Sequence, residues 1–144
     1  CTAIREAVAV GLPTVAECGG FLYLHTTLTD REGHSYPMAG VLPGKCFDTG
    51  HLVRFGYIEL EENSGYFMPR GGRIRAHEFH YYDSEDNGAD CTAYKPATGR
   101  NYPCIHAGDS HWYGFPHLYY PSCPAFAERF VEKAAQYRQQ RAEK

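Results

Sequence analysis

The chain has 144 residues, of which 43% are apolar and 15% aromatic, and its formal net charge is −3 at pH 7. Such a composition can fill a hydrophobic core and excludes global disorder. No basic stripe is present, which argues against a nucleic-acid partner, and no apolar run is long enough to cross a membrane. We therefore expect residues 1–144 to form a single domain.

The first predicted elements are a helix, a short strand and a second helix. Apolar residues at helical spacing predict a helix over residues 2–10, which a glycine and a proline then end. Thr14-Val15-Ala16 has the pattern of a short buried strand, and Phe21-Leu22-Tyr23-Leu24 can begin the next helix. Cys18-Gly19-Gly20 stands between them and predicts a sharp turn.

Cys18 is a candidate nucleophile at this turn. A side chain at Gly19 or Gly20 would crowd the bend, so the turn needs small neighbours. The sulfur would lie at the carboxyl edge of a sheet, and the following helix would favour thiolate over thiol. The alternative is a buried structural cysteine, although a core strand gains nothing from two glycines.

The middle of the chain is rich in predicted strands. A polar turn at residues 30–34 precedes a segment at 38–44 that resembles a strand ending in a turn. Alternating patterns predict strands over residues 53–60 and 73–82, and a shorter strand over 92–94.

The last third is predicted to contain an acidic loop, a final strand and a final helix. The loop covers residues 83–90, and the strand covers 113–120. The helix runs from Ala125 to about Tyr137, and a charged tail at 138–144 is expected to fray. Its apolar face is formed by Phe126, Phe130, Val131 and Ala134. Strands between helical ends predict an α/β fold with a mixed, partly antiparallel sheet flanked by helices.

The segment His77-Glu78-Phe79-His80 resembles a metal-binding motif but lies in a strand pattern. On a strand, His77 and Phe79 face one way, whereas Glu78 and His80 face the other. Two histidines on opposite faces cannot share an ion, so we expect no metal site. Glu78 and His80 could instead orient each other or a substrate, or form a polar pair at a sheet edge.

A cysteine nucleophile needs a base that is close in space, and an imidazole titrates near neutral pH. The chain has eight histidines, and spacing alone leaves the choice among them open. His117 is one candidate, because it lies near the end of a strand in the last third of the chain, just before the final helix.

None of the six cysteines is spaced as Cys-x-x-Cys, which argues against a zinc knuckle. The chain is long enough to form its own core without disulfides, so we expect reduced thiols and a cytoplasmic location. These cysteines are Cys1, Cys18, Cys46, Cys91, Cys104 and Cys123.

Several segments resemble a known family in the order in which they occur. The segments are Ala-Glu-Cys-Gly-Gly-Phe-Leu-Tyr-Leu at 16–24, Gly-Val-Leu-Pro-Gly at 40–44, Val-Arg-Phe-Gly-Tyr at 53–57, Ala-His-Glu-Phe-His-Tyr at 76–81 and His-Leu-Tyr-Tyr-Pro-Ser-Cys-Pro at 117–124. Together they resemble the glutaminase domain of cobyrinate a,c-diamide synthases. This CobB/CobQ-type family is a subgroup of the class I, or triad, glutamine amidotransferases.

The resemblance implies a flavodoxin-like α/β domain that hydrolyses glutamine. Cys18 would be the nucleophile, His117 the base, and the backbone amide of Gly19 an oxyanion donor. Glu78 and His80 would shape the rim of the site or a docking face. No cofactor is implied for this domain itself.

The resemblance also implies a separate N-terminal synthetase domain that uses ATP and Mg. That domain would amidate the a and c carboxylates of cobyrinate with the ammonia released here. We accordingly expect this chain to be an N-terminally truncated, C-terminal fragment, without the family's first strand and glycine-rich loop. A sheet edge left bare in this way would favour pairing with another chain, including a second copy.

The chain departs from the family beside the candidate base. Family members usually have a histidine two residues after the catalytic histidine, and wider class I enzymes have an orienting glutamate there, but this chain has Tyr119. A tyrosine can hold an imidazole by a hydrogen bond but adds no negative charge. Two alternatives stay open: another acceptor, such as cobyric acid, a nickel tetrapyrrole or a cell-wall lipid, or an inert docking module.

Overall fold

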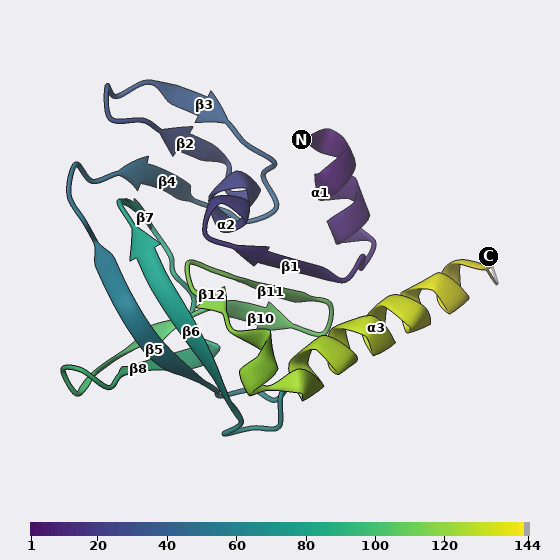
Figure 1. The fold of residues 1–144 in the computed structure, drawn as a ribbon. Helices are drawn as coiled ribbons and strands as arrows, with labels where there is room; N and C mark the ends of the chain where they lie inside the picture. The colour runs from purple at the N-terminus through teal and green to yellow at the C-terminus, as the bar shows by residue number, and fades with distance from the viewer. Residues whose placement is uncertain (143–144) are drawn as a thin grey trace.

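The computed structural model describes residues 1–142, which form a mixed α/β fold with three small sheets (Figure 1). The helices are α1 (Thr2–Ala9), α2 (Gly19–Leu24), the 3-10 turn η1 (Tyr120–Ser122) and α3 (Pro124–Ala142). The strands are β1 (Thr14–Glu17), β2 (Thr27–Thr29), β3 (Ser35–Pro37), β4 (Lys45–Asp48), β5 (Arg54–Glu62), β6 (Arg73–His80), β7 (Tyr82–Ser84), β8 (Cys91–Lys95), β9 (Arg100–Cys104), β10 (His106–Gly108), β11 (His111–Gly114) and β12 (His117–Leu118). The α/β class expected from the sequence is confirmed.

The three sheets have the strand orders β1-β11-β10, β12-β6-β5-β8-β9 and β3-β2-β4-β7. In the first sheet β1 runs parallel to β11, so that Glu17 pairs with Gly114 at the carboxyl end of both strands. The second sheet is antiparallel at every pairing. Its edge strand β12 follows β11 after only two residues, which brings the ends of the two sheets together.

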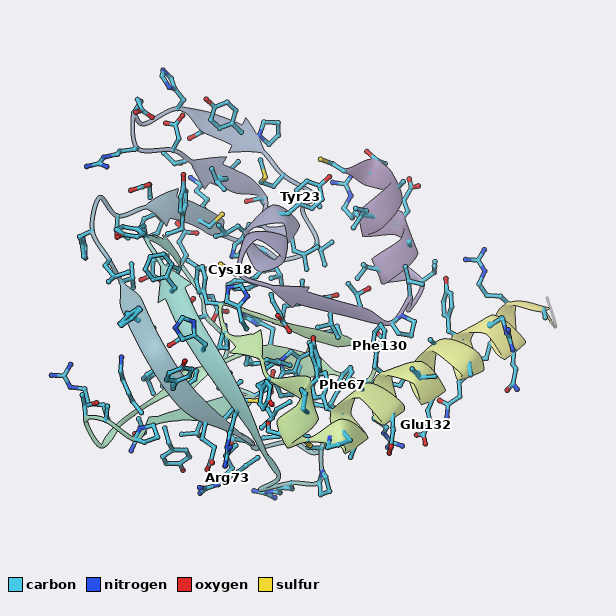
Figure 2. The ribbon with its side chains drawn as sticks, in the orientation of Figure 1. Cys18, Tyr23, Phe67, Arg73, Phe130 and Glu132 are labelled. Carbon is cyan, nitrogen blue, oxygen red and sulfur yellow. The ribbon has the colours of Figure 1, made fainter. Side chains whose placement is uncertain are left out.

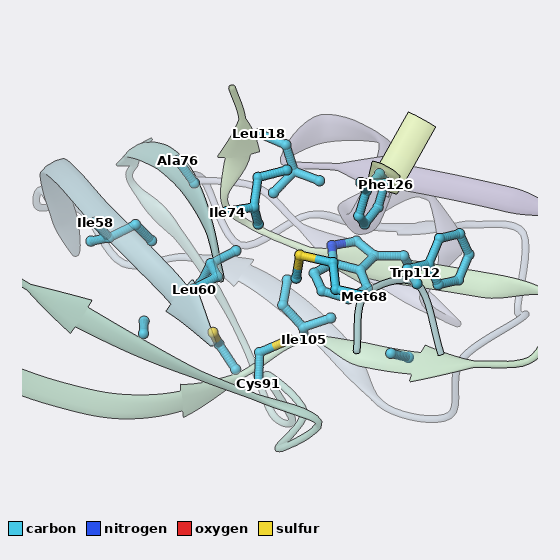
Figure 3. Packing of buried hydrophobic residues seen from close by; sticks show 14 residues of the cluster. Ile58, Leu60, Met68, Ile74, Ala76, Cys91, Ile105, Trp112, Leu118 and Phe126 are labelled. Atoms are coloured by element: carbon cyan, nitrogen blue, oxygen red, sulfur yellow. The ribbon is translucent and has the colours of Figure 1, made fainter. Parts of the chain in front are cut away.

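Two hydrophobic clusters hold these sheets together. The larger one lies between the second sheet, β11 and the start of α3, where Trp112 packs edge-on against Phe126 (Figure 3). The smaller one packs Phe21 and Leu24 of α2 against Tyr113 and Phe115. Because β11 supplies side chains to both clusters, it links the turn after β1 to the main core.

The predicted strand over residues 38–44 is wrong. This segment is irregular, and Gly40 and Gly44 have φ values of +68° and +96°, which an extended strand does not allow. Val41 and Leu42 pack against the smaller cluster, which explains the apolar pattern.

Other observed strand boundaries differ from the predicted ones because a continuous segment can contribute strands to two different sheets. The predicted strand over 73–82 is two strands, since β6 ends at His80 and β7 pairs with β4 in another sheet. The predicted strand over 113–120 is likewise divided between β11 and β12. Helix α2 ends at Leu24, and Thr27–Thr29 form β2. The strands β3, β4, β9 and β10 were not predicted from the sequence pattern.

The final helix α3 is longer than predicted and extends away from the body of the protein (Figure 1). Phe126 is buried and Phe130 packs against the main core, whereas Val131 is 64% exposed. Figure 2 shows Phe130 and Glu132 on different sides of this helix. Of the predicted tail, residues 138–142 are helical and residues 143–144 lie outside the described part. No helix within residues 1–142 combines the length and apolar character needed to cross a membrane.

Candidate active site

Cys18 occupies the turn between β1 and α2 (Figure 2). Its backbone has φ +47° and ψ −106°, a conformation that residues other than glycine rarely adopt. Two hydrogen bonds fix it: the Cys18 N–H donates to the Gly114 carbonyl at 2.9 Å, and the Cys18 carbonyl accepts from the Leu22 N–H at 3.0 Å. The backbone at Cys18 is therefore held in a strained conformation by the strand on one side and the helix on the other.

The predicted reason for the two glycines is wrong. A Cβ atom at Gly19 would meet nothing within 4 Å, and one at Gly20 would lie 3.5 Å from the Cβ of Ala16, an ordinary contact. The unusual φ belongs to Cys18 itself. The turn therefore does not need glycine at either position to avoid a clash.

The Cys18 thiol is half-buried, and its pKa is raised above the usual value of 9.0. Loss of hydration is the largest cause; a hydrogen bond from the Gly19 N–H lowers the pKa, and the charge of Glu17 raises it further. The predicted thiolate is therefore not favoured. Helix α2 has only six residues, so its dipole is too weak to offset burial. A nucleophile at Cys18 requires a base.

His117 begins β12, which pairs with β6 so that His117 lies opposite His77. Its side chain is 49% exposed, and Nδ1 lies 3.8 Å from Oε2 of Glu17. Glu17 directly precedes Cys18 in the chain. The tertiary structure thus brings the segment of the candidate base next to the segment of the candidate nucleophile.

Glu17 also contacts Tyr120, whose hydroxyl donates a hydrogen bond of 2.6 Å to Oε1 of Glu17. Burial, with this hydrogen bond as a second cause, raises the pKa of Tyr120 well above its usual range. Tyr119 instead has an exposed side chain, and its N–H donates to the Arg75 carbonyl at 2.8 Å. Within residues 1–142 no hydrogen bond joins Tyr119 to His117.

Glu17 is the residue that sequence reasoning missed. A glutamate at the last position of a short strand, directly before a candidate nucleophile, was the available signal. It became interpretable only when the fold showed that β12 begins beside it.

Glu78 and His80 lie inside the protein and not at a sheet edge. Both side chains lie on the buried face of β6, as the strand alternation predicted. Glu78 accepts a hydrogen bond from the Tyr102 hydroxyl, and its Oε1 lies 3.8 Å from Nε2 of His80. The His80 ring stacks on Phe115 with centroids 3.9 Å apart. These two residues therefore support the segment that leads to His117.

A hollow of about 710 Å³ lies on the outer face of β5, β6 and β12. His117 and Tyr119 line one part of it, and Tyr57, His77 and Arg75 line another. No group of three or more His, Cys, Asp or Glu side chains within residues 1–142 is placed to hold a metal ion.

Residues 1–109 match the family described as the CobB/CobQ-like glutamine amidotransferase domain. The chain is 32% identical over 137 residues to a cobyrinate a,c-diamide synthase of Caldanaerobacter subterraneus subsp. tengcongensis, which covers 93% of this chain and 30% of that protein. It is 31% identical over 144 residues to the Thermoplasma volcanium protein of the same name, covering 96% of this chain and 31% of that protein. The chain therefore spans about 30% of the length of these curated relatives.

Proposed function

The chain belongs to the CobB/CobQ-like glutamine amidotransferase family, and from that premise we propose that it hydrolyses glutamine with Cys18 as nucleophile and His117 as base. The observation that supports this best is the contact between Glu17 and His117, 3.8 Å at Nδ1. This contact places the imidazole of His117 beside Glu17, which directly precedes Cys18 in the chain. The half-buried Cys18 is accessible enough to meet a substrate.

The raised pKa of Cys18 sets the order of steps. His117 takes the proton of the thiol as the sulfur attacks the side-chain carbonyl carbon of glutamine. The imidazolium then gives that proton to the departing nitrogen, ammonia leaves, and a thioester remains. Water, activated by His117, cleaves the thioester and releases glutamate. The Gly19 N–H, which lowers the pKa of the Cys18 thiol, is proposed to donate to the oxyanion.

We propose further that the ammonia serves the ATP- and Mg-dependent amidation of cobyrinate. The relatives that the chain resembles are named cobyrinate a,c-diamide synthases and are about three times longer. The acceptor reaction would belong to a synthetase domain outside this chain. A cytoplasmic location suits this proposal, because all six cysteines, each within residues 1–142, are free.

The test uses the full-length protein and two nitrogen sources. Cys18→Ala should abolish glutamine-dependent amidation and leave ammonia-dependent amidation unchanged. Cys123→Ala, at another half-exposed cysteine, should leave both unchanged. If glutamine-dependent amidation survives in Cys18→Ala, Cys18 is not the nucleophile and the proposal fails.

A further inference from the structure

We propose that Glu17 is the positioning residue for His117: it holds the imidazole with its proton on Nδ1, so that Nε2 is free to accept the thiol proton. This inference rests on the proposed function and assigns the third member of its site. The position two residues after the base, where class I enzymes carry a glutamate, holds Tyr119 here. The negative charge comes instead from the residue before the nucleophile.

The two carboxylate oxygens of Glu17 have different partners. Oε1 accepts the Tyr120 hydroxyl at 2.6 Å, and Oε2 lies 3.8 Å from Nδ1 of His117. The raised pKa of Tyr120 keeps its hydroxyl protonated, and therefore a donor, throughout the neutral range. Tyr120 thus fixes the rotamer of Glu17 and turns Oε2 toward the imidazole.

The backbone of Glu17 is equally well fixed. Glu17 is the last residue of β1, in register with Gly114 of β11, and the next residue donates to the Gly114 carbonyl. The side chain of Glu17 is 22% exposed, so water screens its charge only in part. A carboxylate whose backbone and side chain are both fixed in this way is suited to orient the imidazole ring of His117.

A carboxylate beside Nδ1 selects the tautomer that carries a proton on that nitrogen, and it stabilises the imidazolium formed after proton transfer. The distance of 3.8 Å is longer than a hydrogen bond, and catalytic hydrogen bonds commonly shorten when substrate binds. Nε2 of His117 has no hydrogen-bond partner within residues 1–142. It is therefore available to accept the thiol proton.

The effect of Glu17 on Cys18 is opposite to its effect on His117. Its charge raises the pKa of Cys18 and so opposes the thiolate. Removing the charge should make the thiol easier to ionise and yet slow the reaction, because the base loses its orientation. A purely structural role for Glu17 would not produce these two opposite effects.

The test is Glu17→Gln in the full-length protein, since Gln keeps an oxygen for Tyr120 and removes only the charge. We expect kcat for glutamine hydrolysis to fall about tenfold or more, with KM nearly unchanged. At pH 7 to 8, iodoacetamide should label Cys18 faster than in the wild type. Glu6→Gln, on the exposed helix α1, is the control that should match the wild type in both measurements.

A third readout does not need activity. Nitrogen-15 NMR of His117, assigned by loss of its signals in His117→Gln, should show the proton on Nδ1 in the wild type and a mixture of tautomers in Glu17→Gln. If the wild type itself fails to hydrolyse glutamine, the proposed function falls, while the tautomer still decides the role of Glu17. If hydrolysis is confirmed but Glu17→Gln retains the wild-type kcat, or His117 carries its proton on Nε2 in both proteins, this inference is overturned and the proposed function stands.

Discussion

The carboxylate of Glu17 lies 3.8 Å from the imidazole of His117, although the two residues belong to different sheets. Glu17 ends β1 in the three-stranded sheet, and His117 begins β12 at the edge of the five-stranded sheet. The candidate site is therefore formed where two sheets meet. Phe115 links the two sheets, because it packs with Tyr113 of β11 in the smaller cluster and stacks on His80 of β6.

The reactivity of Cys18 should increase with pH up to at least pH 8.5. Its pKa lies above 9.0, so the thiolate fraction, and with it the rate of alkylation by iodoacetamide, should rise about tenfold per pH unit in this range. The rate is measured on the Cys18 peptide by mass spectrometry, with the exposed Cys1 as an internal reference. A rate that reaches a plateau below pH 8 would show a lowered pKa and contradict the structure.

Replacing Cys18 with glycine should stabilise the protein relative to replacing it with alanine. The φ of +47° with ψ −106° is strained for a side chain and open to glycine, so Cys18→Gly should exceed Cys18→Ala by about 1 kcal/mol in free energy of unfolding. Urea denaturation followed by circular dichroism measures the difference. Both variants should lack glutamine hydrolysis. Equal or reversed stabilities would mean that the turn is not strained at this residue.

Glu62 should be important for stability and not for chemistry. Its carboxylate is fully buried and accepts backbone N–H donors from the turn after β5. These donors belong to Tyr66, Phe67 and Met68. Glu62→Ala leaves them unpaired and should cost about 3 kcal/mol in free energy of unfolding.

The matched control for Glu62 is its neighbour Glu61, whose partly exposed carboxylate pairs with Arg73. Glu61→Ala should cost less than about 1 kcal/mol, because exposed ion pairs contribute little. Thermal and urea unfolding compare the two. If both variants lose similar free energies of unfolding, the buried hydrogen bonds of Glu62 contribute no more to stability than the partly exposed ion pair of Glu61.

Tyr120→Phe should slow glutamine hydrolysis without preventing it. The change removes the hydroxyl that orients Glu17 and keeps the ring, so kcat should fall about three- to tenfold, corresponding to about 1 kcal/mol for one hydrogen bond. Tyr119→Phe is the matched neighbour and should behave as the wild type, because no hydrogen bond joins Tyr119 to His117 among the described residues. The opposite ranking of the two variants would return the orienting role to Tyr119.

The local elements and the position of the candidate nucleophile could be predicted from the amino-acid sequence. The helix before Gly11, the turn at Cys18 and the strands around Ile58 and Ala76 are encoded in short-range patterns: helical spacing, glycine placement and two-residue alternation. The alternation also predicted that Glu78 and His80 share a face. The family resemblance added the candidate pair of Cys18 and His117.

The tertiary structure alone decided how these elements combine. Residues 73–82 and 113–120 each divide between two sheets, because a strand that changes partners keeps the same local pattern. The raised pKa of Cys18 comes chiefly from burial, which is a property of the folded chain and not of the local sequence. The contact of Glu17 with His117 likewise joins residues that no local pattern links. Ion pairs and loss of hydration are set by distances in space, and those distances exist only once the sheets have packed.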